Sequence, residues 1–156
     1  MSVRMSGKSS AEAWFRTAKE HLSDADYFYA KGKYDSAYRY AVYSGEIALK
    51  AVLVKFNKFI QSRHKHHDQS RLVQNIRAEK CLPQDMIDEI DGTVSSLDNV
   101  DLQSERGDYV VCGSHQVGNL RYSVGESTPA EMIGREDAEE KIRLAKELLD
   151  LLSRIF

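Results

Sequence analysis

The pattern of apolar and polar residues is most informative in the segment covering residues 34–56. Wound as a helix, this segment is apolar on almost every side, and only Glu46 and Lys50 carry charge in its central turns. A helix that is apolar all round must be buried inside a bundle rather than lie on its surface. We therefore expect this segment to form the centre of the fold, with Asp35 capping its start. We expect the helix to end at about Phe59.

A first helix is predicted before this central one. Ser9 to Glu12 has the sequence of a capping box, in which a serine oxygen and a glutamate carboxylate bond the free N–H groups of a helix start. Gly32 is expected to end the helix, because glycine adopts the left-handed conformation after the last turn at little cost. A connection this short predicts an antiparallel helical hairpin. The apolar stripe of the first helix is Trp14, Ala18, Leu22, Ala25 and Tyr29.

Three further helices are predicted after the hairpin. A short helix covers Gln69 to Glu79, and Pro83 suits the first turn of a fourth helix. The apolar stripe of that fourth helix is Met86, Ile90, Val94 and Leu97. The last helix has the most regular pattern, with inward residues at intervals of three and four. These residues are Ala138, Ile142, Ala145, Leu149, Leu152 and Phe156.

Residues 98–127 lack the helical period that marks the rest of the chain. Within them, Tyr109 to Cys112 and His115 to Val117 flank Gly113-Ser114, a pair suited to a tight turn between two short strands. A connection of this length in a compact domain is often functional. The fold predicted for residues 1–156 is a single all-α domain, an up-and-down bundle of four to five helices with a long loop or small hairpin before the last helix.

Charge is distributed unevenly along the chain, although the net charge is only -2. Residues 55–80 hold seven Lys or Arg against two acids, a sum of +5, and residues 83–109 hold eight Asp or Glu against one Arg, a sum of -7. Three explanations fit this split: an anionic partner for the basic surface, docking of basic on acidic regions in an oligomer, or two solvated faces that balance. The net charge itself argues against a histone-like nucleic-acid binder.

The cysteines and residues 1–10 indicate where in the cell the protein is expected. Cys81 and Cys112 are too few for a disulfide framework and have no CxxC spacing, as in proteins of a reducing cytosol. Residues 1–10 lack the apolar core of a secretory signal, and no run of 18 apolar residues is present to span a membrane. We expect a cytoplasmic protein.

Glu46 and Lys50 lie one helical turn apart, in the order that favours pairing. One interpretation is a structural polar pair, because charges inside a bundle are rarely unpaired. The other interpretation places Lys50 in a polar site at the edge of the bundle, where it could hold a phosphate. Gly45 costs the helix about 1 kcal/mol relative to alanine, so we expect another helix to approach closely there.

Histidines gather in the segment before the predicted third helix. The residues able to bind zinc or nickel here and further along the chain are His64, His66, His67, Asp68, Cys112 and His115. Neighbouring residues on a loop rarely converge on one ion, so no metal site is predicted. A solvated loop, in which His67 caps or supports the following helix, is the simpler interpretation.

Taken together, these residues resemble a HEPN domain, the small helical bundle found in prokaryotic nucleotidyltransferase-associated proteins and in several RNA-targeting systems. The resemblance covers nearly the whole chain, and it rests on the order and spacing of short pieces rather than on one motif. Those pieces are Ala13-Trp14, Leu22, Ala25 and Phe28, Gly32 to Tyr38, Ser44 to Lys50, His67 with Leu72, Arg121-Tyr122, Glu136 to Ala138, and Ala145.

The resemblance implies a helical bundle that commonly dimerises. Members of the family include metal-independent ribonucleases, nucleotide-binding domains, and partners of minimal nucleotidyltransferases in toxin–antitoxin pairs. The ribonucleases carry an arginine followed four to six residues later by a histidine, just before or within a late helix. There the arginine would hold the scissile phosphate, and the histidine would act as general acid or base.

This chain departs from the ribonuclease pattern. Arg121-Tyr122 occupies the late arginine position, but no histidine follows it anywhere in the sequence. Arg16 and His21 have a suitable spacing, yet they lie in the first helix, where residues five apart diverge by about 140°. The resemblance therefore favours the non-catalytic Arg-Tyr branch of the family.

The sequence thus predicts a HEPN-type binding module without chemistry or a cofactor of its own. It would bind nucleotide or RNA phosphates, or partner a separate nucleotidyltransferase, as a homodimer. The candidate ligand-binding residues are Lys50 as phosphate holder, His67 as orienting group, Arg121 as phosphate clamp and Tyr122 as stacking platform. A structural pairing of Arg121 with a buried acid such as Glu46 fits the sequence equally well.

Two alternatives remain open at this point. The first is a metal-independent endoribonuclease that uses Arg121 with a histidine, supplied by His67 or across a dimer. The second is a structural dimer without a ligand. A face lined by Tyr34 and Tyr38, with Tyr27 as a further candidate, would suit a dimer interface, although ordinary core packing is the default for such residues.

Overall fold

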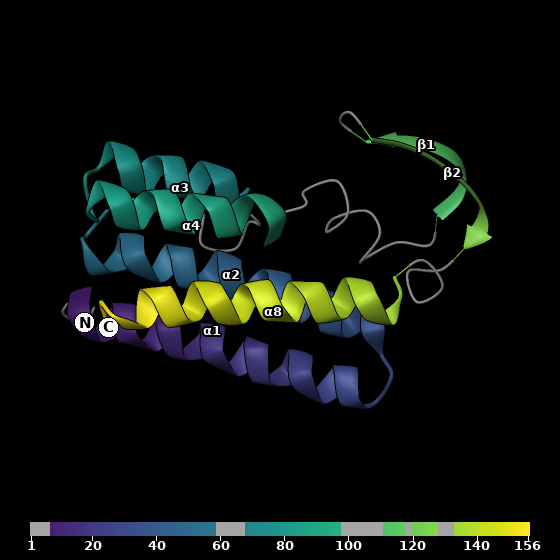
Figure 1. Cartoon of the computed structure of the whole chain (residues 1–156), viewed down its shortest axis with the longest axis horizontal. Coiled ribbons are helices and arrows are strands. Elements are labelled where there is room, and N and C mark those ends of the chain that lie inside the picture. The colour runs from purple at the N-terminus through teal and green to yellow at the C-terminus, as the bar shows by residue number, and fades with distance from the viewer. Residues whose placement is uncertain (1–6, 59–67, 98–110, 118–119, 128–132) are drawn as a thin grey trace, which may run out of the picture.

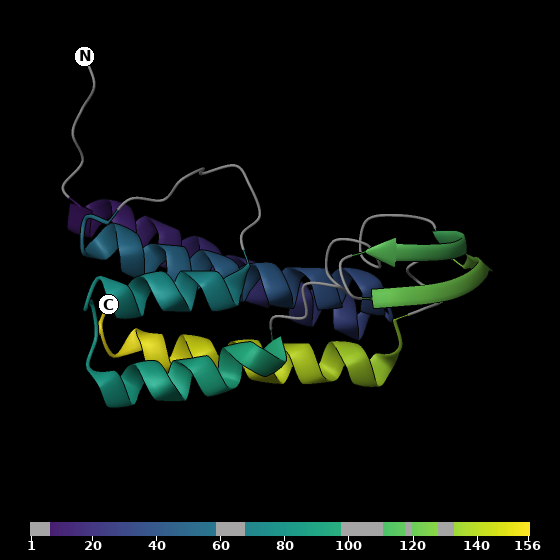
Figure 2. The ribbon, with the colours of Figure 1, turned by 90° about the horizontal axis from the view of Figure 1, so that it is seen from above.

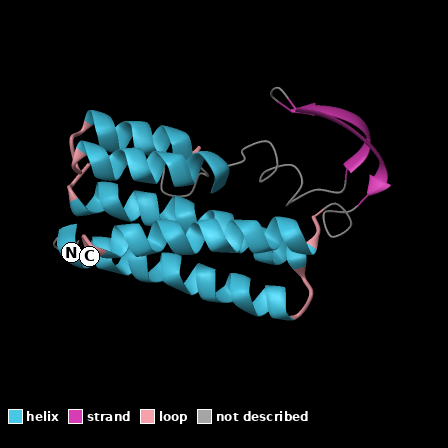
Figure 3. Ribbon diagram, viewed as in Figure 1, coloured by secondary structure: helices cyan, strands magenta, loops and turns pink. Residues whose placement is uncertain are grey.

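The computed structural model describes residues 7–58, 68–97, 111–117, 120–127 and 133–156, which form five helices and one two-stranded hairpin (Figure 1). The helices are α1 (Gly7–Ala30), α2 (Tyr34–Lys55), α3 (Gln69–Ala78), α4 (Gln84–Leu97) and α8 (Arg135–Ser153), and the strands are β1 (Val111–Val117) and β2 (Leu120–Ser127). The helices account for the body of the molecule, and the strands lie to one side of it (Figure 3). The predicted all-α bundle with a small hairpin before its last helix is confirmed.

α1 and α2 form an antiparallel pair along one side of the bundle, and α8 packs against both (Figures 1 and 2). The turn between α1 and α2 forms at the predicted glycine. Gly32 has a φ of 75°, in the left-handed region that glycine adopts at little cost. The N–H of Gly32 donates to the carbonyl of Tyr29 at 3.0 Å, and the N–H of Lys33 donates to that of Phe28 at 2.9 Å. These bonds satisfy carbonyls at the end of α1, as a glycine-terminated helix requires.

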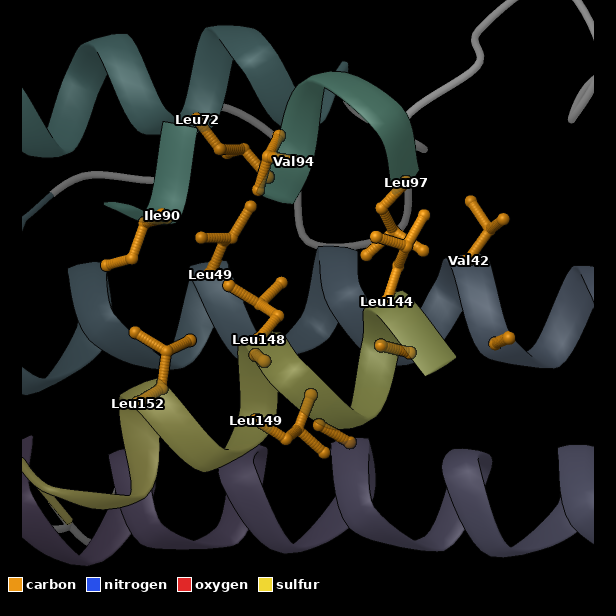
Figure 4. Close-up of a cluster of buried hydrophobic side chains, with 14 of the residues drawn as sticks. Val42, Leu49, Leu72, Ile90, Val94, Leu97, Leu144, Leu148, Leu149 and Leu152 are labelled. Carbon is orange, nitrogen blue, oxygen red and sulfur yellow. The ribbon is translucent and has the colours of Figure 1, made fainter. Parts of the chain in front are cut away.

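α2 is the central helix, as its apolar pattern predicts. It packs against α1, α3, α4 and α8, and thirteen of its 22 residues are buried. Leu49 of α2 lies among Leu72 of α3, Val94 of α4 and Leu148 of α8, so side chains from four helices meet in one apolar cluster (Figure 4). Removal of this apolar surface from water is the main stabilising contribution to such a bundle.

Side chains of two other helices lie very close to α2 at Gly45. A Cβ atom added there would lie 2.6 Å from Cδ2 of Leu97 and 2.8 Å from Oε1 of Gln69, which is closer than van der Waals contact. Leu97 is the last residue of α4 and Gln69 is the first residue of α3, so both helices contact α2 at this position. The predicted close approach at Gly45 is confirmed.

Both ends of α2 and the start of α1 differ from the sequence-based expectation, and α4 begins at Gln84, one residue after Pro83. α1 begins at Gly7, so Ser9 lies inside the helix rather than capping it. The N-cap of α2 is Lys33, and Asp35 instead lies in the first turn, where a carboxylate still favours the positive helix end. α2 ends at Lys55 rather than Phe59, because the chain turns at Asn57, which has a φ of 55°.

The hairpin forms with a different register from the predicted one. β1 and β2 are antiparallel, with Val117 opposite Leu120, so the strands are joined across residues 118–119. Gly113 and Ser114, the predicted turn, lie inside β1 opposite Val124 and Ser123. The sequence Gly-Asn at 118–119 is itself a turn pair, and it competes with Gly-Ser for the same role.

Candidate functional site

A line of polar residues runs along one face of the otherwise apolar α2. Arg39, Tyr43, Glu46 and Lys50 follow one another at intervals of four, three and four residues, which places them on one side of a helix. Arg39 and Tyr43 are half-buried, whereas Glu46 and Lys50 are buried. We call these four residues the α2 polar stripe. The sequence analysis singled out only its second half, although the spacing alone would have identified all four.

Glu46 and Lys50 form an ion pair inside the bundle. Lys50 Nζ lies 3.0 Å from Oε2 of Glu46, and the two residues are only 2% and 4% exposed. Removal of one member of such a buried pair is destabilising, because the remaining charge loses this partner in a medium that solvates it poorly. The geometry agrees with the structural interpretation of the pair. It also means that Lys50 could bind a phosphate only in exchange for, or in addition to, its contact with Glu46.

The start of α3 is fixed against α2 next to this stripe. Gln69 is fully buried, and its Nε2 donates to the backbone carbonyl of Val42 at 2.8 Å. Asp68 is the N-cap of α3, and its carboxylate accepts a bond from the N–H of Ser70 at 2.9 Å. The positive end of a helix therefore lies beside the α2 turn that leads to Glu46. The capping role considered for His67 belongs to Asp68, and His67 itself lies outside the described residues.

Arg121 and Tyr122 belong to the hairpin rather than to a helix. Both residues lie in β2, where Arg121 is opposite Gln116 and Tyr122 is opposite His115. The strands extend past the end of the bundle at which α8 begins (Figures 1 and 2). Glu46 and Lys50 are thus brought together, whereas the predicted association of Arg121, Tyr122 and His67 with Lys50 stays a prediction.

A second buried lysine was missed by the sequence analysis. Lys141 of α8 is 5% exposed, and its Nζ donates to the carbonyl of Ser96 at 2.5 Å, in the last turn of α4. The same ammonium lies 5.6 Å from the ring centre of Tyr38 on α2. A cation is favourable at the C-terminal end of a helix and over an aromatic ring. Through these two contacts the Lys141 ammonium links α8 to α4 and to α2. Its position, three residues after Ala138 and one before Ile142, was a signal that it belongs to the apolar face.

The tyrosines proposed for a dimer face do not share one surface. Tyr38 is 2% exposed and lies in the core, so the default interpretation holds for it. Tyr34 is half-buried and packs edge-on against Tyr29, with ring centres 5.6 Å apart. Tyr27 is 59% exposed. Tyr38 is thus excluded from a dimer face, whereas a role for Tyr27 and Tyr34 stays a prediction.

Two pKa shifts outside the stripe have simple causes. Burial raises the pKa of the Cys81 thiol, against a smaller lowering by nearby Lys58, so the thiol stays protonated at neutral pH. The hydroxyl of Tyr29, which accepts a bond from Arg135 Nε at 3.0 Å, raises the pKa of that guanidinium. Neither shift creates a nucleophile or a general base.

Metal-ligating residues do not converge in the described ranges. Among those residues, no group of three His, Cys, Asp or Glu side chains is placed to hold an ion. The histidines at 64, 66 and 67 lie outside those ranges, and the absence of a metal site there stays a prediction.

The helices of the described part were also compared with the length and apolarity that a membrane span requires. Over residues 7–58, 68–97, 111–117, 120–127 and 133–156, none of the helices meets both requirements.

Comparisons with known proteins identify the family. The chain resembles the crystal structure of ST0689, described as an archaeal HEPN homologue, with 23% identity and a TM-score of 0.62 over 92% of this chain and 95% of that one. It also resembles the crystal structure of TT1696 from Thermus thermophilus, with 20% identity and a TM-score of 0.66 over 94% and 98% of the two chains. No curated protein matches the sequence. The HEPN domain family model matches residues 11–155, and the chain therefore belongs to the HEPN family.

Proposed function

We propose that this protein is a HEPN-type binding module that recognises nucleotide or RNA phosphates as a homodimer and catalyses no reaction itself. The observation that carries the proposal is the sequence around Arg121. This arginine is followed by Tyr122 and by no later histidine, so the sequence does not have the late arginine–histidine pair of the family's ribonucleases. It retains an arginine able to grip phosphate through two N–H groups.

The α2 polar stripe supplies the rest of the proposed site. Lys50 would hold a phosphate beside Glu46, and His67, directly before the N-cap of α3, would orient it. Arg39, one turn before Tyr43 on the same face of α2, is added to the sequence-based set as a second cation. Tyr122 would stack on a base.

Binding is tested by isothermal titration of the purified protein with ATP, GTP and short single-stranded RNA. We expect heat with at least one of these ligands, and a loss of about tenfold or more in affinity for Arg121→Ala, since an arginine–phosphate contact is charge-assisted. Arg154→Ala is the matched control, because Arg154 is exposed after the end of α8 and should leave the affinity unchanged. No heat with any ligand would contradict the proposal and favour a structural dimer.

The alternative is a metal-independent endoribonuclease that uses Arg121 with His67. It is tested by incubating the protein with total RNA in the presence of EDTA. Our proposal predicts intact RNA. Cleavage that is abolished by Arg121→Ala and by His67→Ala would overturn the non-catalytic function and establish the alternative.

We further propose that a minimal nucleotidyltransferase is the partner protein, in an arrangement of the toxin–antitoxin kind. Affinity purification of the tagged chain from its native cells, followed by mass spectrometry, tests this part. A nucleotidyltransferase recovered in equal amount with the chain would support it. Recovery of the chain alone, with ligand binding intact, would remove the partner and leave the binding function.

A further inference from the structure

Gln69, the first residue of α3, is a polar side chain that the fold encloses completely, with an exposed fraction of 0%. A polar group buried to this degree is costly unless it makes hydrogen bonds, so its contacts show what it holds in place. Asp68, directly before it, is exposed and caps the helix. The start of α3 thus carries one side chain for the helix itself and one for the contact with α2.

The Gln69 amide lies against the backbone of one turn of α2. Its Nε2 donates to the carbonyl of Val42 at 2.8 Å. Its Oε1 lies 2.8 Å from the point that a Cβ atom of Gly45 would occupy, and this oxygen has no hydrogen-bond partner among the residues that the structure describes. The amide therefore fits only because position 45 has no side chain, and α3 cannot slide along α2 without breaking the bond to Val42.

The turn that Gln69 contacts is the one that carries Glu46. In an α-helix the carbonyl of Val42 also accepts the N–H of the residue four positions later, which is Glu46. The Gln69 side chain and the Glu46 backbone therefore share one acceptor. Glu46 in turn holds the Lys50 ammonium, with Oε2 and Nζ 3.0 Å apart. A continuous series of contacts thus joins Gln69 to Lys50, first through the backbone of α2 and then through the ion pair.

The placement of the Lys50 ammonium matters for a phosphate contact. A lysine has a long flexible stem, and its ammonium acts on a phosphate as a point charge. A cation that is already fixed in the free protein loses less freedom when a ligand binds, and this raises the affinity. Glu46 fixes Lys50 only as far as its own turn of α2 is held.

We propose that Gln69 is a positioning residue for the phosphate site of the proposed function. Its amide fixes the turn of α2 from Val42 to Glu46, and Glu46 thereby holds the Lys50 ammonium where the phosphate binds. Gln69 itself touches no ligand. This inference rests on the proposed function and assigns the residue that keeps its buried cation in place. If Gln69 only anchored α3, its loss would lower stability and leave the affinity of the folded protein unchanged.

The first test is NMR relaxation of the Lys50 side chain in the free protein. Gln69→Met keeps a similar volume and removes the amide, and the Val42 carbonyl keeps the N–H of Glu46, so the variant should fold. We expect the order parameter of Lys50 Cε to fall, because the turn that holds its partner is no longer fixed by α3. Ile76→Val is the matched control, since it loosens the buried packing of α3 at the other end of that helix. It should leave the order parameter at the wild-type value.

The second test is ligand affinity, measured by titration with ATP, GTP and the short single-stranded RNA. Gln69→Met is expected to weaken the binding seen with the wild type about five- to tenfold, and Ile76→Val by no more than about twofold. Gly45→Ala crowds the same amide from α2 and should weaken binding in the same way. Because Gln69→Met and Gly45→Ala disturb one contact, the double variant should bind within about twofold of the weaker single variant. Gln69→Met combined with Arg121→Ala should instead multiply the two losses, since Arg121 lies in the hairpin.

The outcomes separate this inference from the proposed function. Wild-type affinity in Gln69→Met, or an equal loss in Ile76→Val, would overturn the positioning role, and binding by the wild type would still support the proposed function. An unchanged order parameter of Lys50 in Gln69→Met would overturn the route through Glu46. A wild-type chain that binds none of the three ligands would overturn the proposed function and this inference together.

Discussion

Two ion pairs of the bundle have the same spacing along a helix but different surroundings. Glu46 and Lys50 on α2 are four residues apart and 3.0 Å from each other, with side chains at most 5% exposed. Arg143 and Glu147 on α8 are also four residues apart, at 2.8 Å, with side chains 60% and 50% exposed. Distance therefore does not distinguish the pairs. Burial does, because water screens the exposed charges and cannot reach the buried ones.

Two grooves of the molecule also differ in how many charged side chains line them. Along the groove of about 510 Å³ between α1 and α8, charges are numerous and paired, as in the contact of Lys146 with Asp26 at 3.2 Å. The groove of about 320 Å³ between α1 and α2 is lined by Ala13, Trp14, Thr17 and Ile47, none of which carries a charge. Water screens the charges that line the first groove, whereas the second groove offers mainly apolar side chains.

The largest effect expected from this comparison is at Lys50. Lys50→Met removes the ammonium and leaves the Glu46 carboxylate buried without it. We expect a loss of about 3–5 kcal/mol in the free energy of unfolding, a large part of the stability of a domain this size. Chemical denaturation measures it. A loss below about 1 kcal/mol would mean that Glu46 is stabilised adequately by other groups, and burial would no longer explain the difference between the pairs.

The next prediction concerns packing beside the buried pair. Gly45→Ala places a methyl group where Leu97 and Gln69 already lie, although alanine favours the helix. We expect a net loss of about 1–3 kcal/mol, since a crowded core must shift to accept the extra carbon. Gly92→Ala on α4 is the control, because no atom lies within 4 Å of the added carbon there. It should stabilise the protein. Equal effects at the two glycines would refute the close approach of the helices.

A smaller effect is expected at an exposed residue that caps a helix. Asp68→Ala removes the cap of α3 and leaves the N–H of Ser70 without its 2.9 Å bond. We expect a loss of about 1 kcal/mol in the free energy of unfolding. Asp68→Asn should keep most of the stability, since asparagine also caps helices. A loss as large as that of Lys50→Met would show that exposure is a poor guide to the energy of polar contacts in this protein.

The smallest effect is expected for the exposed pair. Arg143→Ala should change the free energy of unfolding by no more than about 0.5 kcal/mol, in line with other exposed pairs one helical turn apart. Added salt should reduce even this difference, because it screens surface charges. Denaturation of the variant at low and high salt provides the measurement. A salt-independent loss above about 2 kcal/mol would place the pair in the same energetic class as Glu46 and Lys50.

The helices could be predicted from the sequence because their signals are local. The intervals of three and four residues located α8, and Gly32 located the end of α1. The boundaries of α2 were less accurate, since several residues near each end are compatible with helix and only backbone bonding selects among them. The hairpin turn was misplaced because two glycine-containing pairs lie within seven residues of each other.

The candidate site was predicted only in part. The Glu46–Lys50 pair follows from spacing, whereas Lys141 was missed because its acceptor, the carbonyl of Ser96, is 45 residues away in the sequence. No local pattern indicates a contact of that kind. The anchoring of α3 through Gln69 and Val42, which are 27 residues apart, was missed for the same reason.

The sequence by itself determined that the chain is a helical bundle, that α2 lies at its centre, and that Glu46 and Lys50 meet. Each of these follows from a period of 3.6 residues, which can be recognised within a short helical segment. Only the tertiary structure decided how deeply that pair is buried and which helices approach α2 at Gly45. These properties depend on the packing of segments that are distant in the chain, and therefore on the shapes of surfaces that exist only once the helices have assembled.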